Sequence, residues 1–235
     1  MLAPTKINIV TTYYSDNLGD AVIGDSFAHL VLQHLPNAQI QHVDLSGRTA
    51  FGKHYIKDKS KMQHIMAATP KFLRPLWVWG AWQVMLQPRI IPLWKALIEP
   101  QSPIIIGGGQ LLIDNDLNYP LKLNALFQLA RKFKSPVAIN SISVGKRWSL
   151  IAKKLLKRGI KESTYFSVRD EQSFAAFKNH LPITPRLSVD PAVCSAAAYN
   201  VAVSKSRTKL PIGLGIASPM ELKTVSGNKH LSMQR

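Results

Sequence analysis

Cysteine, long apolar runs and acidic residues are all scarce in this sequence of 235 residues. The single cysteine, Cys194, excludes an internal disulfide framework and a cysteine-based zinc site, and it favours a reducing compartment. No run of about 18 apolar residues is present, which argues against a membrane-spanning helix. Residues 1–10 show no charged stretch followed by an apolar core and a small-residue cleavage site, so we expect a cytoplasmic protein.

The shortage of acidic residues leaves a large positive charge. Thirty Lys and Arg face thirteen Asp and Glu, which gives a formal net charge of +17. Such a field attracts phosphorylated metabolites, acidic glycans, anionic lipid head groups or nucleic acid, and the charge alone does not choose among them. Hydrophobic residues make up 46% of the chain, an ordinary fraction for a globular protein that excludes wholesale disorder.

Two hydrophobic periodicities alternate along residues 1–200. Apolar and β-branched runs predict strands at 6–12, 39–45, 103–106, 137–144, 164–168 and 186–189. Helical spacing predicts one helix from 20 that Pro36 ends, and further helices at 118–134, 148–158 and 171–179. Strands that alternate with helices in this way predict an α/β fold with a Rossmann-like, doubly wound, mostly parallel sheet.

Two regions depart from this alternation. Residues 46–100 carry four of the five tryptophans and are expected to form a helical insertion. Its segment 75–88 is expected to be a core or inter-domain helix, with a membrane-surface helix as the alternative. Residues 196–209 are typical of a linker, and 210–217 looks like an opening strand with little chain after it. We therefore predict an N-terminal domain over 1–200 and the start of a truncated second domain over 201–235. The alternative is that 210–217 joins the first sheet.

The loop after the first predicted strand, Ser15–Asp20, is the first candidate for chemistry. Open α/β sheets bind ligands where strands end and helices begin, because helix N-termini offer free N–H groups and a positive dipole end. Gly19 permits a tight turn, Asn17 can cap the helix or bind a hydroxyl, and Asp20 can cap or accept a proton from a sugar hydroxyl. A structural turn with an N-cap is the alternative.

Three glycines follow the 103–106 strand. Gly107, Gly108 and Gly109 allow a backbone to approach a ligand closely, at a cost in folding entropy that favours a functional loop over a merely flexible one. Asp114 and Asp116 come next, and without a third ligand they are expected to be solvated or capping residues rather than a metal site.

Two further strand ends carry charged residues. Arg169 follows the 164–168 strand, where its guanidinium can grip a phosphate or carboxylate with two N–H groups. Asp170 and Ser173 can instead form an N-cap with Arg169 paired to the acid, and Asp190 lies at the end of the last strand. Together the strand ends are expected to converge on one polar, anion-attracting crevice.

The motifs NxGD (17–20), GGG (107–109), SVRDxxS (167–173) and VDPA (189–192), in this order, resemble the polysaccharide pyruvyl transferase family over residues 6–195. Residues 212–217 also resemble the strand that opens that family's second domain. The resemblance implies a two-domain architecture like that of GT-B glycosyltransferases, of which this chain holds the first half. It also implies transfer of a pyruvyl group from phosphoenolpyruvate to a sugar of a cell-surface glycan, with formation of a ketal and release of phosphate.

The resemblance also implies roles for individual residues. The catalytic residues would be Asp20, as a candidate base, and Arg169, facing an anionic group. The substrate-binding residues would be Asn17, Gly19, Gly107, Gly108 and Gly109. The residues that hold the loops in shape would be Asp170, Ser173 and Asp190. No metal and no cofactor is expected, with phosphoenolpyruvate as the donor and a glycan or lipid-linked saccharide as the acceptor.

Two other functions are compatible with the sequence. One is a GT-B-like glycosyltransferase that uses a nucleotide sugar, and the other is a basic module that binds anions or membranes without catalysis. The basic helix near 146–161 is expected to be a solvated face first and a contact for an anionic membrane second, which would place the protein at the inner face of the membrane. Nucleic acid is the least expected partner, because no recognised binding module accompanies the charge.

Overall fold

The computed structural model describes residues 5–52, 69–70 and 72–201. All of them belong to one compact unit, Met1–Val201. The predicted opening strand at 210–217 lies outside the described residues, as do most of the predicted linker and residues 53–68 of the predicted insertion. The proposed division into two domains therefore stays a prediction.

The sheet confirms the predicted α/β class. Its six strands lie in the order β2-β1-β3-β4-β5-β6, and every pairing between neighbours is parallel. The strands are β1 (Lys6–Thr11), β2 (Gln39–Asp44), β3 (Ile104–Gly107), β4 (Val137–Ile142), β5 (Tyr165–Val168) and β6 (Arg186–Leu187). The chain runs outward from β1 to β2 and then reverses from β1 through β3 to β6. In sheets of this kind, ligands bind at the carboxyl edge where the order reverses, here between β1 and β3.

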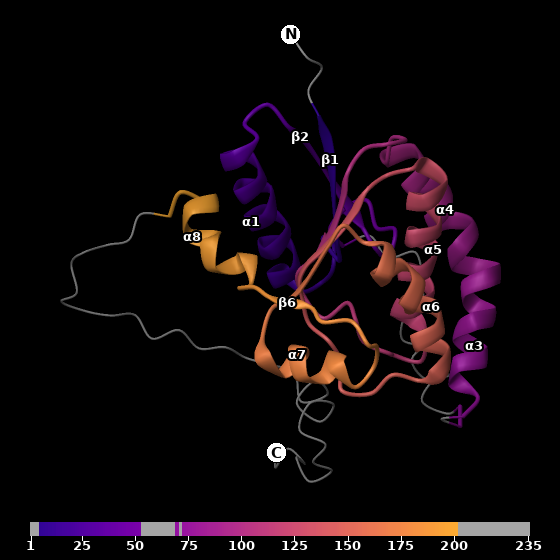
Figure 1. The fold of residues 1–235 in the computed structure, drawn as a ribbon. Coiled ribbons are helices and arrows are strands. Elements are labelled where there is room, and N and C mark those ends of the chain that lie inside the picture. Colours follow the sequence, from indigo (N-terminus) through magenta and orange to yellow (C-terminus); the bar gives the residue numbers. More distant parts are fainter. Residues whose placement is uncertain (1–4, 53–68, 71, 202–235) are drawn as a thin grey trace, which may run out of the picture. The chain divides into compact units, whose positions relative to one another are not determined.

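Helices cover both faces of the sheet (Figure 1). On one side α1 (Leu18–His34) contacts η2 (Pro191–Cys194) and α8 (Ser195–Ala198). On the other side lie α3 (Arg74–Ala81), α4 (Gln87–Leu97), α5 (Asn118–Phe133) and α6 (Leu150–Glu162), and α7 (Glu171–Lys178) follows β5. The bounds of the four predicted helices shift by up to four residues. At the start of α6, for example, Ser149 Oγ accepts a hydrogen bond from Ala152 N at 3.1 Å, so the helix begins at Leu150.

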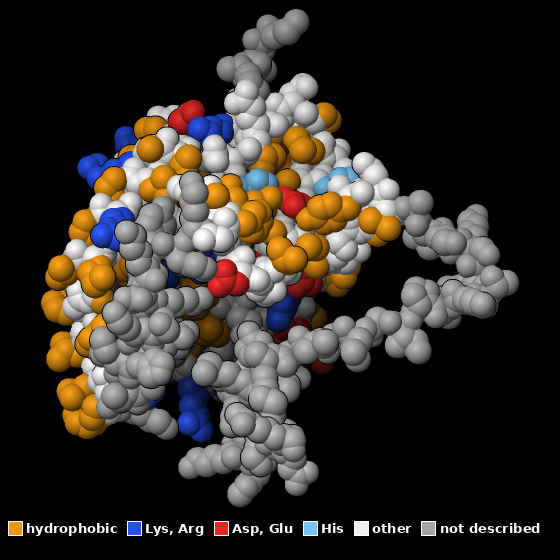
Figure 2. Space-filling view, turned by 180° about the vertical axis from the view of Figure 1, so that it is seen from behind, with side chains coloured by type: hydrophobic (Ala, Val, Ile, Leu, Met, Phe, Trp, Pro, Cys, Tyr) orange, Lys and Arg blue, Asp and Glu red, His pale blue; other side chains and the backbone are white. Residues whose placement is uncertain are grey.

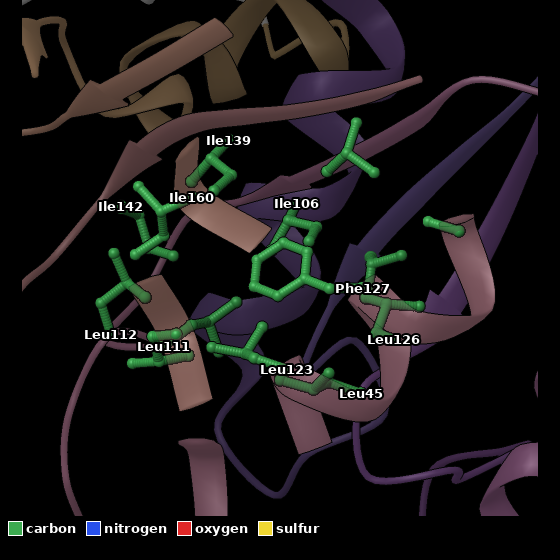
Figure 3. Packing of buried hydrophobic residues seen from close by; sticks show 14 of the residues in the cluster. Leu45, Ile106, Leu111, Leu112, Leu123, Leu126, Phe127, Ile139, Ile142 and Ile160 are labelled. Carbon is green, nitrogen blue, oxygen red and sulfur yellow. The ribbon is translucent and has the colours of Figure 1, made fainter. Parts of the chain in front are cut away.

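The core forms where α5 and α6 pack on the sheet (Figure 3). Ile106 of β3 and Ile139 of β4 project toward Phe127 of α5, and all three side chains are buried. These are the apolar positions of the predicted strands and helices. On the opposite face a smaller cluster joins Ile9 to Ile23 and Phe27 of α1.

The predicted insertion contributes one interrupted helix. It runs through α3, continues as the π-helical segment η1 (Trp82–Leu86) and ends as α4. Trp94 is fully buried, and its Nε1 donates to the carbonyl of Asp44 at 3.1 Å, which ties the insertion to the end of β2. Trp82 is also buried. This segment therefore packs on the core with one side, while its other side is exposed to solvent.

Candidate active site

The carboxyl edge of the sheet holds a cavity of about 370 Å³. Its walls bring together half of the ten site residues singled out from the sequence: Asn17, Gly19, Asp20, Gly109 and Arg169. These come from the loop after β1, the loop after β3 and the loop after β5, as expected when parallel strands end at one edge. A second cavity of about 280 Å³ shares Gln110, Ile113 and Arg169 with the first.

Asp20 has a fixed orientation at the start of α1. Its Oδ2 accepts hydrogen bonds from Thr12 Oγ1 at 2.7 Å and Ser15 Oγ at 2.6 Å. Its Oδ1 has only a long contact, 3.4 Å from Asn17 Nδ2, and it lies on the side of Gly109. One carboxylate oxygen is therefore used to hold the group in place, and the other is left for a ligand in the cavity.

Asn17 acts locally as the N-cap of α1. Its Oδ1 accepts from Gly19 N at 3.1 Å, while its backbone carbonyl accepts from Asp20 N at 3.0 Å. The helix begins at Leu18, two residues before the predicted start, because this cap sets its first turn. Asn17 and Gly19 also line the cavity, so capping and ligand contact are both open to this loop.

The three glycines have different surroundings. A Cβ on Gly107 would overlap the carbonyl oxygen of Asn140 and the ring of Phe27, and a Cβ on Gly108 would overlap Ile23. These two glycines therefore let α1 approach β3 closely, which is a packing reason for them. Gly109 has a φ of +67°, and the one atom near its missing Cβ is Asp20 Oδ1 at 3.6 Å. Of the three, Gly109 alone lines the cavity.

Arg169 is held by two carboxylates. Its Nε donates to Asp170 Oδ2 at 3.3 Å, and its Nη1 donates to Asp190 Oδ2 at 3.1 Å. The guanidinium carries five N–H groups, so three hydrogens remain beyond these two contacts. Because Arg169 lines both cavities, we infer that the remaining N–H groups are those that can meet an anionic ligand.

Asp170, Ser173 and Asp190 bond to the backbone around Arg169. Asp170 caps α7 through its Oδ1, which accepts from Ser173 N at 2.6 Å, and Asp190 caps η2 by accepting from Ala192 N at 3.0 Å. Ser173 Oγ in turn accepts from Val144 N at 3.1 Å. Burial alone would raise the pKa of Asp170, but hydrogen bonds from Ser173 and Arg169 outweigh it and hold that pKa below its usual value.

The charge of the crevice differs from the sequence-based expectation. Among the described residues, the charged side chains that line the two cavities are Asp20, Asp170, Arg169 and Lys146, which balance in formal charge. The N-termini of α1 and α7 are capped by their own Asn17 and Asp170 side chains. The chain's excess of +17 is therefore not concentrated here, and the expected anion-attracting crevice depends on Arg169 and Lys146.

Tyr119 is a site residue that the sequence did not single out. It follows Asn118 at the start of α5 and lines the same cavity as residues of the loop after β1. Burial raises the pKa of Tyr119, and the negative charge of Asp20, which lines the same cavity, raises it further, while Arg48 acts in the opposite direction. The sequence feature that could have pointed to Tyr119 is its position at the start of the helix that follows the glycine loop 107–109.

A buried lysine lies one turn beyond Tyr119. Lys122 Nζ donates to Ser46 Oγ at 3.0 Å, and its side chain is almost fully enclosed. Burial, and then the neighbouring Arg48 charge, lower the pKa of Lys122 to about 8, although the carboxylate of Asp44 acts in the opposite direction. This cluster adjoins the cavity wall without lining it, and no sequence pattern indicated it.

A polar network interrupts the end of β4. Ser141 has a φ of +53° at a shift in the β4–β5 register, so the predicted strand 137–144 ends at Ile142. Ser141 Oγ donates to Asn140 Oδ1 at 3.0 Å and lies 3.1 Å from Ser188 Oγ, and Ser167 Oγ donates to Asn140 Oδ1 at 2.8 Å. Bulges of this kind are common next to active sites because they redirect the chain. In the sequence, this network was indicated only by polar residues, Asn140 and Ser141, within the otherwise apolar strand.

Asp114 has a structural role. Its Oδ1 accepts from Leu117 N at 3.0 Å and its Oδ2 accepts from Ser149 N at 2.7 Å, which joins the loop after β3 to the start of α6. Within the described ranges, no group of three or more His, Cys, Asp or Glu side chains is placed to hold a metal ion.

Comparison with known proteins bears on the whole set of motifs. No curated protein and no solved structure matched the chain. A family model described as polysaccharide pyruvyl transferase matches residues 17–228, a span that begins at Asn17 and includes every candidate site residue. The match extends over most of the sequence, and the structure brings Asn17, Asp20, Gly109 and Arg169 together at one edge of the sheet. The chain therefore belongs to the polysaccharide pyruvyl transferase family.

Proposed function

We propose that this protein transfers a pyruvyl group from phosphoenolpyruvate to a sugar of a cell-surface polysaccharide, in the cytoplasm, at the carboxyl edge of the sheet. Membership of the family supports the transferase class and a polysaccharide acceptor. The observation that carries the proposal is that a carboxylate, Asp20, and a guanidinium, Arg169, line one cavity from the carboxyl ends of two different strands. A cation for the donor and a base for the acceptor are the two groups that this reaction needs.

The reaction balances without a redox partner or a metal ion. Two hydroxyls of one sugar bond to C2 of phosphoenolpyruvate, C3 gains a proton to become a methyl group, and the bond between C2 and the phosphate oxygen breaks. In the overall balance, one of the two hydroxyl protons ends on C3 and the other on the phosphate that leaves. The product is a cyclic ketal that keeps the carboxylate of the donor.

Each residue has a role in this scheme that follows from its contacts. Asp20 is fixed through Oδ2, so its Oδ1 can accept the proton of the attacking hydroxyl. Arg169 directs its remaining N–H groups toward the phosphate or carboxylate of the donor, and Lys146 adds a second positive charge beside it. Tyr119 and Asn17 line the same cavity and are suited to hydrogen-bond sugar hydroxyls.

The proposal is tested by incubating the protein with phosphoenolpyruvate and a panel of glycans while released phosphate is measured. Asp20→Asn keeps the shape and the hydrogen-bond acceptor but lowers the basicity, so we expect phosphate release to fall by about a hundredfold or more. The matched control is Asp25→Asn on the same helix, because Asp25 contacts the hydroxyls of Tyr13 and Tyr199 outside the cavity.

The same assay separates this function from nucleotide-sugar chemistry. Phosphate release that depends on a glycan and is lost in Asp20→Asn alone supports the proposal. Binding of a nucleoside diphosphate, with no binding of phosphoenolpyruvate and no phosphate release across the panel, would contradict it.

A further inference from the structure

The outer side of α3 and η1 carries an unusual number of exposed apolar side chains. The members of this set, called here the α3–η1 face, are Phe72, Leu73, Leu76, Trp79, Val84 and Met85. Their exposed fractions range from 41% at Leu73 and Met85 to 80% at Phe72. Figure 2 shows hydrophobic side chains along the left margin, the side that Figure 1 gives to α3 and α4 before the half-turn. An apolar surface of this extent is typical of a docking site.

The surroundings of the α3–η1 face are basic. The sequence has no Asp or Glu from 69 to 98, whereas Lys95 of α4 and Lys132 of α5 are exposed beside the face. Both lysines line a cavity of about 410 Å³ together with Trp79 and Trp82. Two more exposed lysines, Lys154 and Lys157, lie on α6, which packs against α5.

This cavity joins the apolar and the basic features at one place. Trp79 and Trp82, Leu155 of α6 and the two lysines all line it. Indole rings beside ammonium groups suit the boundary between lipid tails and phosphate head groups, where an apolar body and a polar end are both satisfied. The π-helical segment η1 lies at this cavity, and such segments occur frequently at functional sites.

Charge decides which partner fits this face. A second copy of the chain, docked face to face by a twofold axis, would bring the same lysines of both copies toward one another. An anionic surface instead complements them, since each Lys near such a surface adds attraction to the apolar contact. No described helix has both the length and the apolar content needed to cross a bilayer.

We propose that the α3–η1 face lies on the surface of an anionic lipid bilayer, with its apolar side chains among the upper acyl chains and Lys95 and Lys132 at the lipid phosphates. The proposal does not rest on the pyruvyl transfer proposed above. It adds a location to it, because a membrane-bound enzyme would meet lipid-linked saccharides in two dimensions.

Co-sedimentation of the full chain with vesicles tests the proposal. The vesicles are phosphatidylcholine alone, or phosphatidylcholine with about one third phosphatidylglycerol to supply negative charge. We expect binding to the mixed vesicles and at least about tenfold weaker binding to the neutral ones. Leu76→Glu/Val84→Glu places two carboxylates at positions that are 63% and 78% exposed, so the fold is kept while binding to mixed vesicles falls by at least about tenfold.

A matched variant controls for added negative charge. Leu35→Glu/Val193→Glu changes two exposed apolar residues on the α1 side of the sheet, and we expect its binding to equal that of the unmodified protein. Lys95→Gln/Lys132→Gln should reduce the preference for mixed over neutral vesicles. Circular dichroism confirms that each variant is folded.

Three outcomes would overturn the proposal. The first is no binding of the unmodified protein to mixed vesicles. The second is equal loss of binding in the α3–η1 variant and in the control. The third is loss of self-association, measured by sedimentation, in the α3–η1 variant while vesicle binding is unchanged, which would assign the face to a second copy. Vesicle binding needs neither donor nor acceptor, so these results are independent of the assay for phosphate release.

Discussion

Arg169 Nη1 and Asp190 Oδ2 lie 3.1 Å apart and join the loops that follow β5 and β6. The pair is partly exposed, with about a quarter of each side chain accessible. Its contribution to stability is therefore small, on the order of 1 kcal/mol or less. Its main effect is to link the two loops beside the cavities that Arg169 lines.

Arg169→Lys is expected to separate the charge from its geometry. A lysine keeps the positive charge but lacks the planar fork, so it cannot contact Asp170 and Asp190 together and still present two parallel N–H groups to a ligand. We expect the affinity for phosphoenolpyruvate, measured by calorimetry, to fall about tenfold or more. Arg158→Lys, an ion-paired arginine on α6, is the control and should leave the affinity unchanged.

Asp190→Asn tests whether the carboxylate competes with the donor for the guanidinium. The amide oxygen of the substituted side chain can still cap η2 as Asp190 Oδ1 does, while the negative charge beside Arg169 is removed. We expect affinity for phosphoenolpyruvate to be equal or a few times higher in the same titration. A loss as large as that of Arg169→Lys would contradict competition and would show that the ion pair is needed for orientation.

Gly108→Ala is expected to destabilise the fold strongly. Its φ is +68° and its missing Cβ would overlap Ile23 of α1, so strain and a steric conflict add together. We expect a loss of about 2–4 kcal/mol in the free energy of unfolding, measured by urea titration. Gly52→Ala is the matched control: its φ is +71° with no atom within 4 Å, so strain alone applies and the loss should be about 1 kcal/mol.

The side chain that the new methyl group at position 108 would overlap, that of Ile23, can be shortened as well. Ile23→Ala takes away the atoms that the new methyl group would overlap, so the double variant Gly108→Ala/Ile23→Ala should lose less stability than the sum of the two single variants. Strict additivity would contradict the packing reason given for Gly108.

The sequence was sufficient to predict the sheet and the loops that meet at its carboxyl edge. Apolar runs such as 103–106 mark buried strands, and parallel strands end at one edge, so Asn17, Gly108 and Arg169 were predicted to converge. Asn17 and Arg169 line one cavity, whereas Gly108 packs against Ile23 instead. The pattern could not predict contacts between elements far apart in the chain. The packing of Ile23 against Gly108 depends on the distance between α1 and β3, which no local periodicity encodes.

The sequence also could not predict the charge balance of the cavities or the exposure of individual side chains. The net charge of +17 gave no information on where the charge is placed, and in the described residues it is Asp170 and Asp190 that surround Arg169. Likewise, the sequence favoured a core or inter-domain helix over a membrane-surface one for 75–88. The structure shows buried and exposed positions together, since Trp82 is 4% exposed and Trp79 is 48% exposed on the same interrupted helix.

Lys122→Met is expected to stabilise the protein in a manner that depends on pH. The groups that face Lys122 are Arg48, Asp44 and Tyr119, and its pKa falls from 10.5 to about 8 on folding. Below pH 8 the ammonium is charged in both states, so the cost of burying it is present in full. Between about 8 and 10.5 the folded protein has released the proton while the unfolded chain keeps it, so this cost declines as the pH rises.

The variant should therefore gain the most stability at neutral pH, on the order of 2 kcal/mol after allowing for the lost bond to Ser46. The gain should shrink as the pH approaches 10.5, and urea titrations of both proteins at a series of pH values measure it. Lys132→Met, at an exposed position of the same helix, should show no such dependence. A gain that is constant with pH, or that grows above pH 8, would contradict a buried lysine that is neutralised on folding, because the sign of the slope follows from its lowered pKa alone.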